Sequence, residues 1–453
     1  MKKHTRPEQV VIFCFAMAAL LLAACGVVPA APTPIIPPVP TATPQPPPTA
    51  PPTPTTTAPP PEPPNDLDGL SDPERSPDPE RSSTPPPPVE NPIQRLSSGQ
   101  DVIITSLRMF DETTGWAIGG IDGPGDHVLQ TSDGGQTWRD VTPPEPAPTG
   151  DEPQKAANGY FLDQNTAWVS YYYIERYSAD RGPIVWRTQD GGQTWQPGEP
   201  LDTDSFFLPL ILPEPIQFTD PLHGWLMENL HDAGMGKNYV MLYRTVDSGA
   251  TWERIVEPMS GDLQSAGKTA MVFADAQTGV VTFDQGAYLS PFFTLTSDGG
   301  VTWEMLFLPP PETAPNLFDE AFCETNSPSF LSPSNLSIGV VCKTYDDEGE
   351  VRLDHFLYRT GDGGESWRTY PFPGGRLRFT SPDVVWALGG EIYRSEDGGQ
   401  TWALVKTVHW DGQFSFVSET VGWAVARSGD EIALVRTTNG GERWEVVEPA
   451  IGP

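Results

Sequence analysis

Residues 131–138 read Thr-Ser-Asp-Gly-Gly-Gln-Thr-Trp, and six later stretches repeat this pattern with small changes. The repeats stand at 188–195, 245–252, 296–303, 360–367, 395–402 and 437–444. Glycine adopts positive φ at no steric cost, and an aspartate carboxylate accepts backbone N–H bonds within its own turn. Each copy, called a box below, therefore predicts a tight hairpin, and its tryptophan begins the strand that follows.

A second pattern precedes each box: an aromatic residue, a polar turn, and a strand that usually opens with Gly-Trp. Examples are Phe110 before Gly115-Trp116 and Phe218 before Gly224-Trp225. Apolar and polar residues alternate through each unit, which is typical of strands with one buried face. Repeats of this length that cannot bury their own faces indicate a solenoid or a propeller. The sequence therefore predicts an all-β fold, a single seven-bladed β-propeller with four antiparallel strands per blade.

The box resembles the Asp-box, or bacterial neuraminidase repeat, of sialidases, sortilin-type receptors and xyloglucanases. With the Gly-Trp-Ala strand, the region 101–449 is most similar to the photosystem II stability/assembly factor family, which implies an extracytoplasmic seven-bladed propeller. In such a propeller the boxes build the fold rather than the function, and Asn439 fits this role because an amide holds a turn without acid–base chemistry. The residues given structural roles are Asp133, Trp138, Asp190, Trp195, Asp247, Trp252, Asp298, Trp303, Asp362, Trp367, Asp397, Trp402, Asn439 and Trp444.

The first residues predict export from the cytoplasm. Lys2, Lys3 and Arg6 precede an apolar run from residue 10 to residue 24, the pattern of a secretory signal. Residues 22–26 read Leu-Ala-Ala-Cys-Gly and resemble a bacterial lipobox, which implies cleavage before Cys25 and lipid on that cysteine. We expect a cell-envelope lipoprotein with signal peptide 1–24, held at the membrane through Cys25. An uncleaved anchor is the alternative.

Residues 25–99 predict a stalk, because they are rich in proline and threonine and poor in apolar residues. Such a segment lacks the apolar surface to fold and favours extended polyproline II. We expect a disordered Pro/Thr-rich linker over 25–99, followed by the propeller at 100–450. How the ring closes stays open, with 102–105 either pairing onto blade seven or remaining free.

The net charge of −33 and the pI near 4.3 argue against nucleic acid as a partner. Cys323 and Cys342 form an even pair in an oxidising compartment, which predicts a disulfide. It would tie the loop entering blade five to that blade's second strand, and two buried free thiols are the alternative. The scattered histidines give no metal site, and we expect no cofactor.

Catalytic signatures are weak. The tetrapeptide Phe/Tyr-Arg-Ile/Leu-Pro, which is typical of sialidases, does not occur in the sequence. We assign no catalytic residue. Carboxylates are abundant, however, so counting cannot exclude a glycosidase pair.

The candidate binding face consists of aromatic residues in the longer units. Long stretches at 170–182, 198–215, 227–237 and 309–328 read as loops, which we expect on the face opposite the boxes, where binding sites often lie. The alternative is that the aromatics pack these loops onto the blades. The candidates are Tyr171, Tyr172, Tyr173, Tyr177, Phe206, Phe207, Tyr288, Phe292 and Phe293.

An arginine stands three residues before most box aspartates, at 187, 244, 359, 394 and 436. The series predicts a structural ladder that stacks on tryptophan or pairs with neighbouring acids. A partner surface is the alternative.

These observations favour a non-catalytic, lipid-anchored, monomeric propeller that binds a protein, as a scaffold or an assembly-factor-like module. The alternative is a carbohydrate-binding or sialidase-like glycosidase propeller that uses the aromatic face and paired acids such as Glu175 and Asp180. A cluster of arginines around the propeller axis, with a tyrosine beside a glutamate, would favour the carbohydrate hypothesis. A channel lined only by small and apolar residues would favour the protein-binding one. The identity of the partner stays open.

Overall fold

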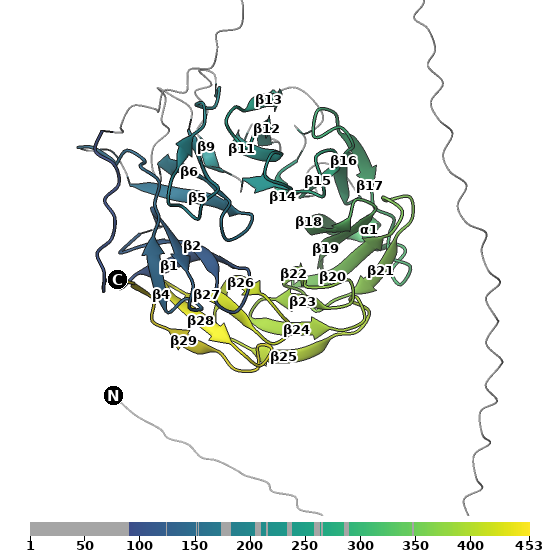
Figure 1. The fold of residues 1–453 in the computed structure, drawn as a ribbon. Helices are drawn as coiled ribbons and strands as arrows, with labels where there is room; N and C mark the ends of the chain where they lie inside the picture. Colours follow the sequence, from purple (N-terminus) through teal and green to yellow (C-terminus); the bar gives the residue numbers. More distant parts are fainter. Residues whose placement is uncertain are drawn as a thin grey trace, which may run out of the picture. The chain divides into compact units, whose positions relative to one another are not determined.

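The computed structural model describes residues 90–453 except 124, 151, 153, 174–182, 204–209, 214–215, 233–237, 258–262, 264–265, 285–289 and 347. The predicted signal peptide and almost all of the predicted stalk lie outside these residues. The described part folds into seven β-sheets arranged as blades around a central opening, which confirms the predicted all-β, seven-bladed propeller (Figure 1). The first strand of each blade lies nearest the opening.

Each blade is a four-stranded antiparallel meander, and blades one and three carry a fifth strand. Blades one and two comprise β1 (Ile103–Met109), β2 (Gly115–Gly120), β3 (His127–Thr131), β4 (Thr137–Asp140), β5 (Lys155–Phe161), β6 (Ala167–Tyr173), β7 (Val185–Thr188) and β8 (Gln196–Pro197). Blades three and four comprise β9 (Leu210–Pro213), β10 (Gln217–Phe218), β11 (Gly224–Asp232), β12 (Asn238–Thr245), β13 (Glu253–Val256), β14 (Lys268–Phe273), β15 (Gly279–Phe283), β16 (Phe292–Thr296) and β17 (Glu304–Phe307). Blade five comprises β18 (Phe322–Ser332), β19 (Asn335–Tyr345), β20 (Val351–Thr360) and β21 (Arg368–Pro371), and α1 (Leu317–Glu320) precedes it. Blades six and seven comprise β22 (Arg376–Phe379), β23 (Val385–Leu388), β24 (Glu391–Ser395), β25 (Ala403–Thr407), β26 (Asp411–Phe416), β27 (Gly422–Ser428), β28 (Glu431–Thr437) and β29 (Glu445–Val447).

The ring closes at blade one through the C-terminal end of the chain. The short strand β30 (Ala450–Ile451) pairs in parallel with β4, on the outer edge of blade one. On the inner side, the backbone N–H groups of Leu107 and Met109 in β1 donate to Gln413 and Ser415 of blade seven. Blade seven therefore joins blade one at both edges, and β1 is blade one's own innermost strand rather than an addition to blade seven.

The box aspartate organises its own hairpin, as the sequence predicts. The Asp133 carboxylate accepts bonds from the Thr131 hydroxyl, the Thr137 backbone N–H and the Thr137 hydroxyl at 2.9, 2.9 and 2.7 Å. Gly134 and Gly135 follow with φ of 79° and 89°, which a residue with a side chain rarely adopts. In the seventh box, the amide oxygen of Asn439 still accepts from Thr437 and Arg443, so an uncharged group holds the same turn.

Neighbouring blades meet through clusters of three aromatic rings. The Trp168 ring of β6 stacks on the Phe218 ring of the next blade at 3.5 Å, and Trp252 of the third box meets Phe218 edge-on at 5.9 Å. Trp225, Phe273 and Trp303 repeat this arrangement between blades three and four. Such ring pairs contribute about 0.5–1.5 kcal/mol each beyond their buried area. The box tryptophans therefore fill the gaps between blades, as predicted.

The glycine of each Gly-Trp pair makes room for the aromatic residue on the paired strand. Phe273 lies directly opposite Gly279, and a Cβ atom on Gly279 would come within 2.5 Å of the Phe273 ring. Gly224 and Gly422 stand in the same relation to Phe218 and Phe416. The recurring Gly-Trp sequence therefore combines a space for the ring of its own blade with a partner for the ring of the next.

Blade five differs from the sequence-based prediction. Residues 322–328, read as part of a loop, belong to β18, because this strand and β19 each extend over 11 residues. The predicted disulfide between Cys323 and Cys342 is present, and it joins two directly opposite residues of β18 and β19 rather than a loop and a strand. None of the helices in the described ranges has the length and apolar composition that crossing a membrane requires.

Replacing Asp247 with alanine tests the role of the box. The change removes the acceptor of the Thr245 hydroxyl, the Thr251 N–H and the Thr251 hydroxyl. We expect a loss of about 1–3 kcal/mol in the free energy of unfolding, measured by urea denaturation. Replacing Glu442, an exposed residue of the seventh box, with alanine is the control and should change little. Equal stability of the Asp247 variant and the native protein would contradict the assignment.

Candidate functional site

Three of the predicted binding-face residues are part of the core. Tyr171 lies on β6 with 6% of its surface exposed, and Phe292 and Phe293 lie on β16 with 1% exposed each. The prediction that they form a binding surface is therefore corrected. These residues were predicted to lie in or beside loops, but they belong to strands. Their side chains therefore pack between blades.

Tyr172 and Tyr173 follow Tyr171 on the same strand and are partly exposed. Burial raises the pKa of the Tyr172 hydroxyl. The Lys155 ammonium lies 5.2 Å from the centre of the Tyr173 ring. Tyr177, Phe206, Phe207 and Tyr288, as well as the proposed acids Glu175 and Asp180, lie outside the described residues.

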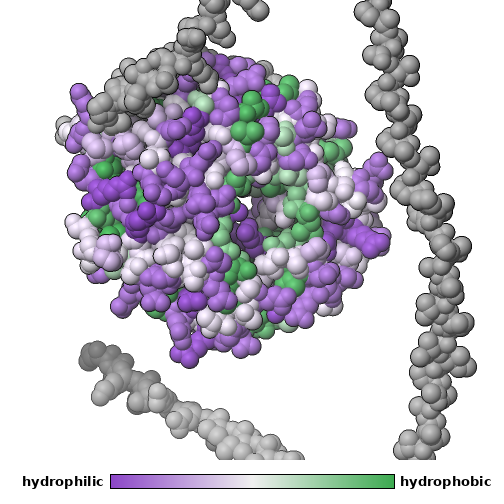
Figure 2. Space-filling view, viewed as in Figure 1, coloured by the Kyte–Doolittle hydropathy of each residue, from purple (hydrophilic) through white to green (hydrophobic). Residues whose placement is uncertain are grey.

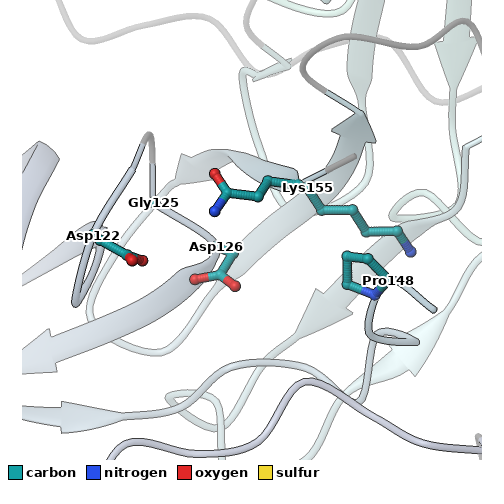
Figure 3. A pocket seen from close by; sticks show the side chains of 6 residues that line it. Asp122, Gly125, Asp126, Pro148 and Lys155 are labelled. Carbon is teal, nitrogen blue, oxygen red and sulfur yellow. The ribbon is translucent and has the colours of Figure 1, made fainter. Parts of the chain in front are cut away.

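A small pocket opens beside this strand, between blades one and two. It has a volume of about 60 Å³, room for a few water molecules, and is lined by Asp122, Gly125, Asp126, Pro148, Gln154 and Lys155. Figure 3 shows the carboxylates of Asp122 and Asp126 at one end, whereas the Lys155 side chain extends toward Pro148. The pocket is therefore polar, and its acidic and basic ends are separated.

Lys155, which lines this pocket, also belongs to a buried ion pair. The Lys155 ammonium is 2.6 Å from Glu145 Oε1, with side-chain exposures of 9% and 11%, and also donates to the Pro146 carbonyl. Trp186 Nε1 donates to the other carboxylate oxygen of Glu145 at 2.8 Å. The Tyr171 hydroxyl is buried nearby without a hydrogen-bond partner among the described residues, and burial together with the charge of Glu145 raises its pKa. The pairing of Lys155 with Glu145 fits a structural role.

His127 fastens the segment before blade one to this region. Its Nδ1 lies 2.5 Å from Asp126, and its Nε2 lies 3.0 Å from the Gln94 carbonyl. Burial acts to lower the pKa of His127, but the bond and charge of Asp126, with help from Gln94 and Asp140, outweigh burial and raise it. Arg95 donates to the carbonyls of Asp140 and Thr142, so residues 94–95 are held against blade one.

Glu228 is a buried acid that the sequence analysis missed. It lies on β11 with 2% of its surface exposed, and burial raises its pKa to about 7, against the weaker effect of a Tyr243 hydrogen bond. Shifted acids of this kind mark many active sites, but an exposed fraction of 2% leaves no access for a substrate. The sequence signal was an isolated acid within the apolar run 224–230, which predicts burial on a central strand.

The arginine series forms the predicted structural ladder. Arg187 donates to the Asp247 carbonyl, Arg244 to Asp298, and Arg359 to Gly398, each bond reaching the box of the next blade. Arg394 pairs with Glu419 at 2.5 Å, and the Arg436 guanidinium lies 4.9 Å above the Trp423 ring. These contacts support the structural interpretation of the series over a partner surface.

The ends of blade five expose a group of apolar side chains. Phe322, Tyr345, Val351 and Leu353 have exposed fractions of 64%, 54%, 51% and 51%. Strand register places Phe322, Lys343 and Leu353 directly opposite one another, and Tyr345 opposite Val351, so all five share one side of the sheet. We call these five residues the blade-five face. Within the described residues, no group of three or more His, Cys, Asp or Glu is placed to hold a metal ion.

No family model and no curated protein matches this chain. Among solved structures, YCF48 from Cyanidioschyzon merolae is similar at 16% identity and a TM-score of 0.37, over 76% of this chain and 97% of its own. The GH74 xyloglucanase from Xanthomonas campestris aligns at 14% identity and a TM-score of 0.42, over 79% of this chain and 56% of its own. Polysaccharide lyase Uly1 aligns at 10% identity and a TM-score of 0.48, over 79% and 94%. These similarities carry no argument about function.

Replacing Glu228 with glutamine tests the buried acid. A pKa of about 7 in the folded state, above the ordinary 4.5, means that the native fold loses stability as pH rises from about 4.5 to 7. We expect the variant to be more stable than the native protein at pH 8, by up to about 3 kcal/mol, and similar at pH 4. Urea denaturation at both pH values measures this, and a pH-independent difference would contradict the assigned ionisation.

Proposed function

We propose that this protein is a non-catalytic propeller that binds a protein partner, as a scaffold or an assembly-factor-like module of the cell envelope, anchored by lipid at Cys25. The observation that carries the proposal is the blade-five face. Large apolar side chains with half or more of their surface exposed, gathered on one side of a rigid sheet, are typical of protein interaction surfaces.

The blade-five face is exposed because blade six is short. Strands β19 and β20 have 11 and 10 residues, whereas β23 and β24 of blade six have 4 and 5. Near the centre of the sheet, Leu357 packs against Leu377 and Val385 of blade six. Leu353 lies on the same side of β20 four residues farther out, beyond His355, where blade six has ended. A partner that fills this step would cover the apolar residues.

The opposite side of the same extension is well anchored. Cys323 and Cys342 are fully buried in a cluster that includes Val280 and Phe293 of blade four. The disulfide and this packing hold the extended strands in one position. A pre-organised surface loses little conformational freedom on binding, which favours affinity.

A carbohydrate-binding function is the second candidate, and one observation favours it. Tyr172 and Tyr173 are partly exposed on the strand beside the pocket of Asp122 and Asp126. An aromatic residue near polar groups suits stacking on a sugar ring. The Tyr173 ring, however, already contacts Lys155, so Tyr172 is the better platform.

Photo-crosslinking tests the protein-binding proposal. A benzoyl-phenylalanine at position 345 of the full-length chain, in its native envelope, should give a discrete crosslinked protein, and Leu353→Glu should abolish it. The control position is Val446, exposed by 68% on the outermost strand of blade seven, where the probe should not give this product. Identical products from positions 345 and 446 would contradict a specific surface.

A glycan array with the same chain separates the two functions. Saccharide binding that is lost in Tyr172→Ala and kept in Leu353→Glu would replace the protein-binding proposal with the carbohydrate one. Hydrolysis of fluorogenic glycosides would contradict the non-catalytic part of the proposal.

A further inference from the structure

Seven positions at the same strand register surround the central opening. Each lies on the innermost strand of its blade and pairs with the tryptophan of the Gly-Trp sequence or with the residue at that register, which in turn lies opposite the third residue before the box Asp or Asn. They are Arg108, Tyr160, Gln217, Val272, Ser329, Arg378 and Ser415. We call them the axial ring. None is acidic, although the chain has 60 aspartates and glutamates and a net charge of −33.

Two arginines and a tyrosine of the axial ring lie together although they come from different blades. The Arg108 guanidinium of blade one is 5.4 Å from the centre of the Tyr160 ring of blade two. Arg378 belongs to blade six, and blade seven stands between it and blade one in the sheet order. Arg378 nevertheless occupies the same register on the innermost strand of its blade, and its charge interacts with Arg108 and Tyr160, so the three groups are near one another.

The two axial arginines differ from the ladder arginines in their partners. Arg187, Arg244 and Arg359 each donate to a carbonyl of the next blade. By contrast, Arg108 and Arg378 form no hydrogen bond or ion pair with any residue in the described part of the chain, and the Arg108 guanidinium lies over the rings of Phe110 and Tyr160. Their N–H groups are therefore available to a ligand.

Other polar members of the ring are already used by neighbouring blades. Gln217 exchanges two hydrogen bonds with the backbone of Phe273, and Ser415 accepts from Met109. Tyr160 is partly exposed, and its hydroxyl makes no hydrogen bond with the described residues. The charged donors of the axial ring that make no hydrogen bond with the described residues are thus the two guanidinium groups, and the Tyr160 phenol lies beside one of them.

The electrostatics of this arrangement are unfavourable without a ligand. The surrounding chain desolvates part of the Arg378 side chain and lowers its pKa, the positive charge of Arg108 lowers it further, and Tyr160 acts in the opposite direction. Two cations held together at the axis repel each other, and an anion between them would remove the repulsion. The Arg378 side chain remains accessible to solvent, and Figure 2 shows that the ring has a visible opening at its centre.

We propose that the axial ring is a binding site for one anionic group of the oxyanion class, held by the guanidinium groups of Arg108 and Arg378 with the Tyr160 hydroxyl as a third donor. Guanidinium presents pairs of parallel N–H groups that match the oxygens of carboxylate, sulfate or phosphate. The site lies at the strand ends near the box hairpins, away from the blade-five face. It is thus independent of the proposed protein-binding surface.

Thermal unfolding and isothermal titration calorimetry of the full-length chain test this site. The probes are sodium acetate, sodium sulfate and sodium phosphate, each compared with sodium chloride at the same ionic strength. We expect at least one oxyanion to raise the Tm of the native protein, and Arg378→Gln to weaken its binding by about tenfold or more. Arg376→Gln, two residues earlier on the same strand and exposed, is the matched control and should retain the effect. Sulfate stabilises proteins in general, so the difference between the two variants isolates the site.

A second readout separates ligand binding from a structural role. Without oxyanion at low salt, Arg378→Gln should unfold at a Tm equal to or above that of the native protein, because it removes one of two repelling charges. Arg108→Gln should behave in the same way, and Arg378→Lys should retain part of the binding. A lower Tm of both glutamine variants without any oxyanion would overturn the proposal in favour of a structural role. Equal oxyanion effects on the native protein and on Arg378→Gln would also overturn it, as would no effect on either.

Discussion

The contact between successive blades is the interaction on which this structure depends. No blade buries both of its faces by itself, so each needs an aromatic ring and a hydrogen-bond acceptor from the next blade, and a space for the aromatic ring of its own innermost strand. Trp225 shows all three: its ring stacks on Phe273, its indole N–H donates to the Gly299 carbonyl, and the glycine before it makes room for Phe218. The box supplies the acceptor because its carboxylate already satisfies the turn's own N–H and hydroxyl groups. The backbone carbonyls of the turn then remain free for the neighbouring tryptophan and arginine.

This division of work explains which residues remain available for function. The box aspartates, the box tryptophans and the ladder arginines are engaged in folding, although they are the most conspicuous residues of the chain. Surfaces without such partners arise where the repeat is uneven. Blade five extends beyond blade six and exposes Phe322, Tyr345, Val351 and Leu353. The axial ring is uneven in another way, because its seven positions carry different residues and only some bond to the next blade.

The fold could be predicted from sequence because the box signal is local and repeated seven times. The ladder followed from the fixed spacing between arginine and box. The binding face could not be placed equally well, because a long unit was read as a long loop. Tyr171, Phe292 and Phe293 lie instead on strands whose alternation continues into the core. The axial ring could not be predicted from local sequence patterns. Arg108 and Arg378 are far apart in sequence and come near each other only when the seven blades close into a ring. The pattern expected of a carbohydrate site was an arginine cluster with a tyrosine beside a glutamate. The axial ring has the arginines and the tyrosine, and none of its seven residues is a glutamate.

Closure of the ring also constrains where the protein can adapt to a ligand. A displacement of one first strand would disturb the bonds that Gln217, Gln413 and Ser415 make to neighbouring blades, so the axial positions are rigid. A fixed backbone around the opening suits a small anion, whose recognition depends on geometry. The extension of blade five projects past the end of blade six, so the side that faces blade six is uncovered there. Only its other side is packed against the rest of the protein. A protein partner can therefore cover it without disturbing the ring, and the two surfaces can evolve separately on the same scaffold.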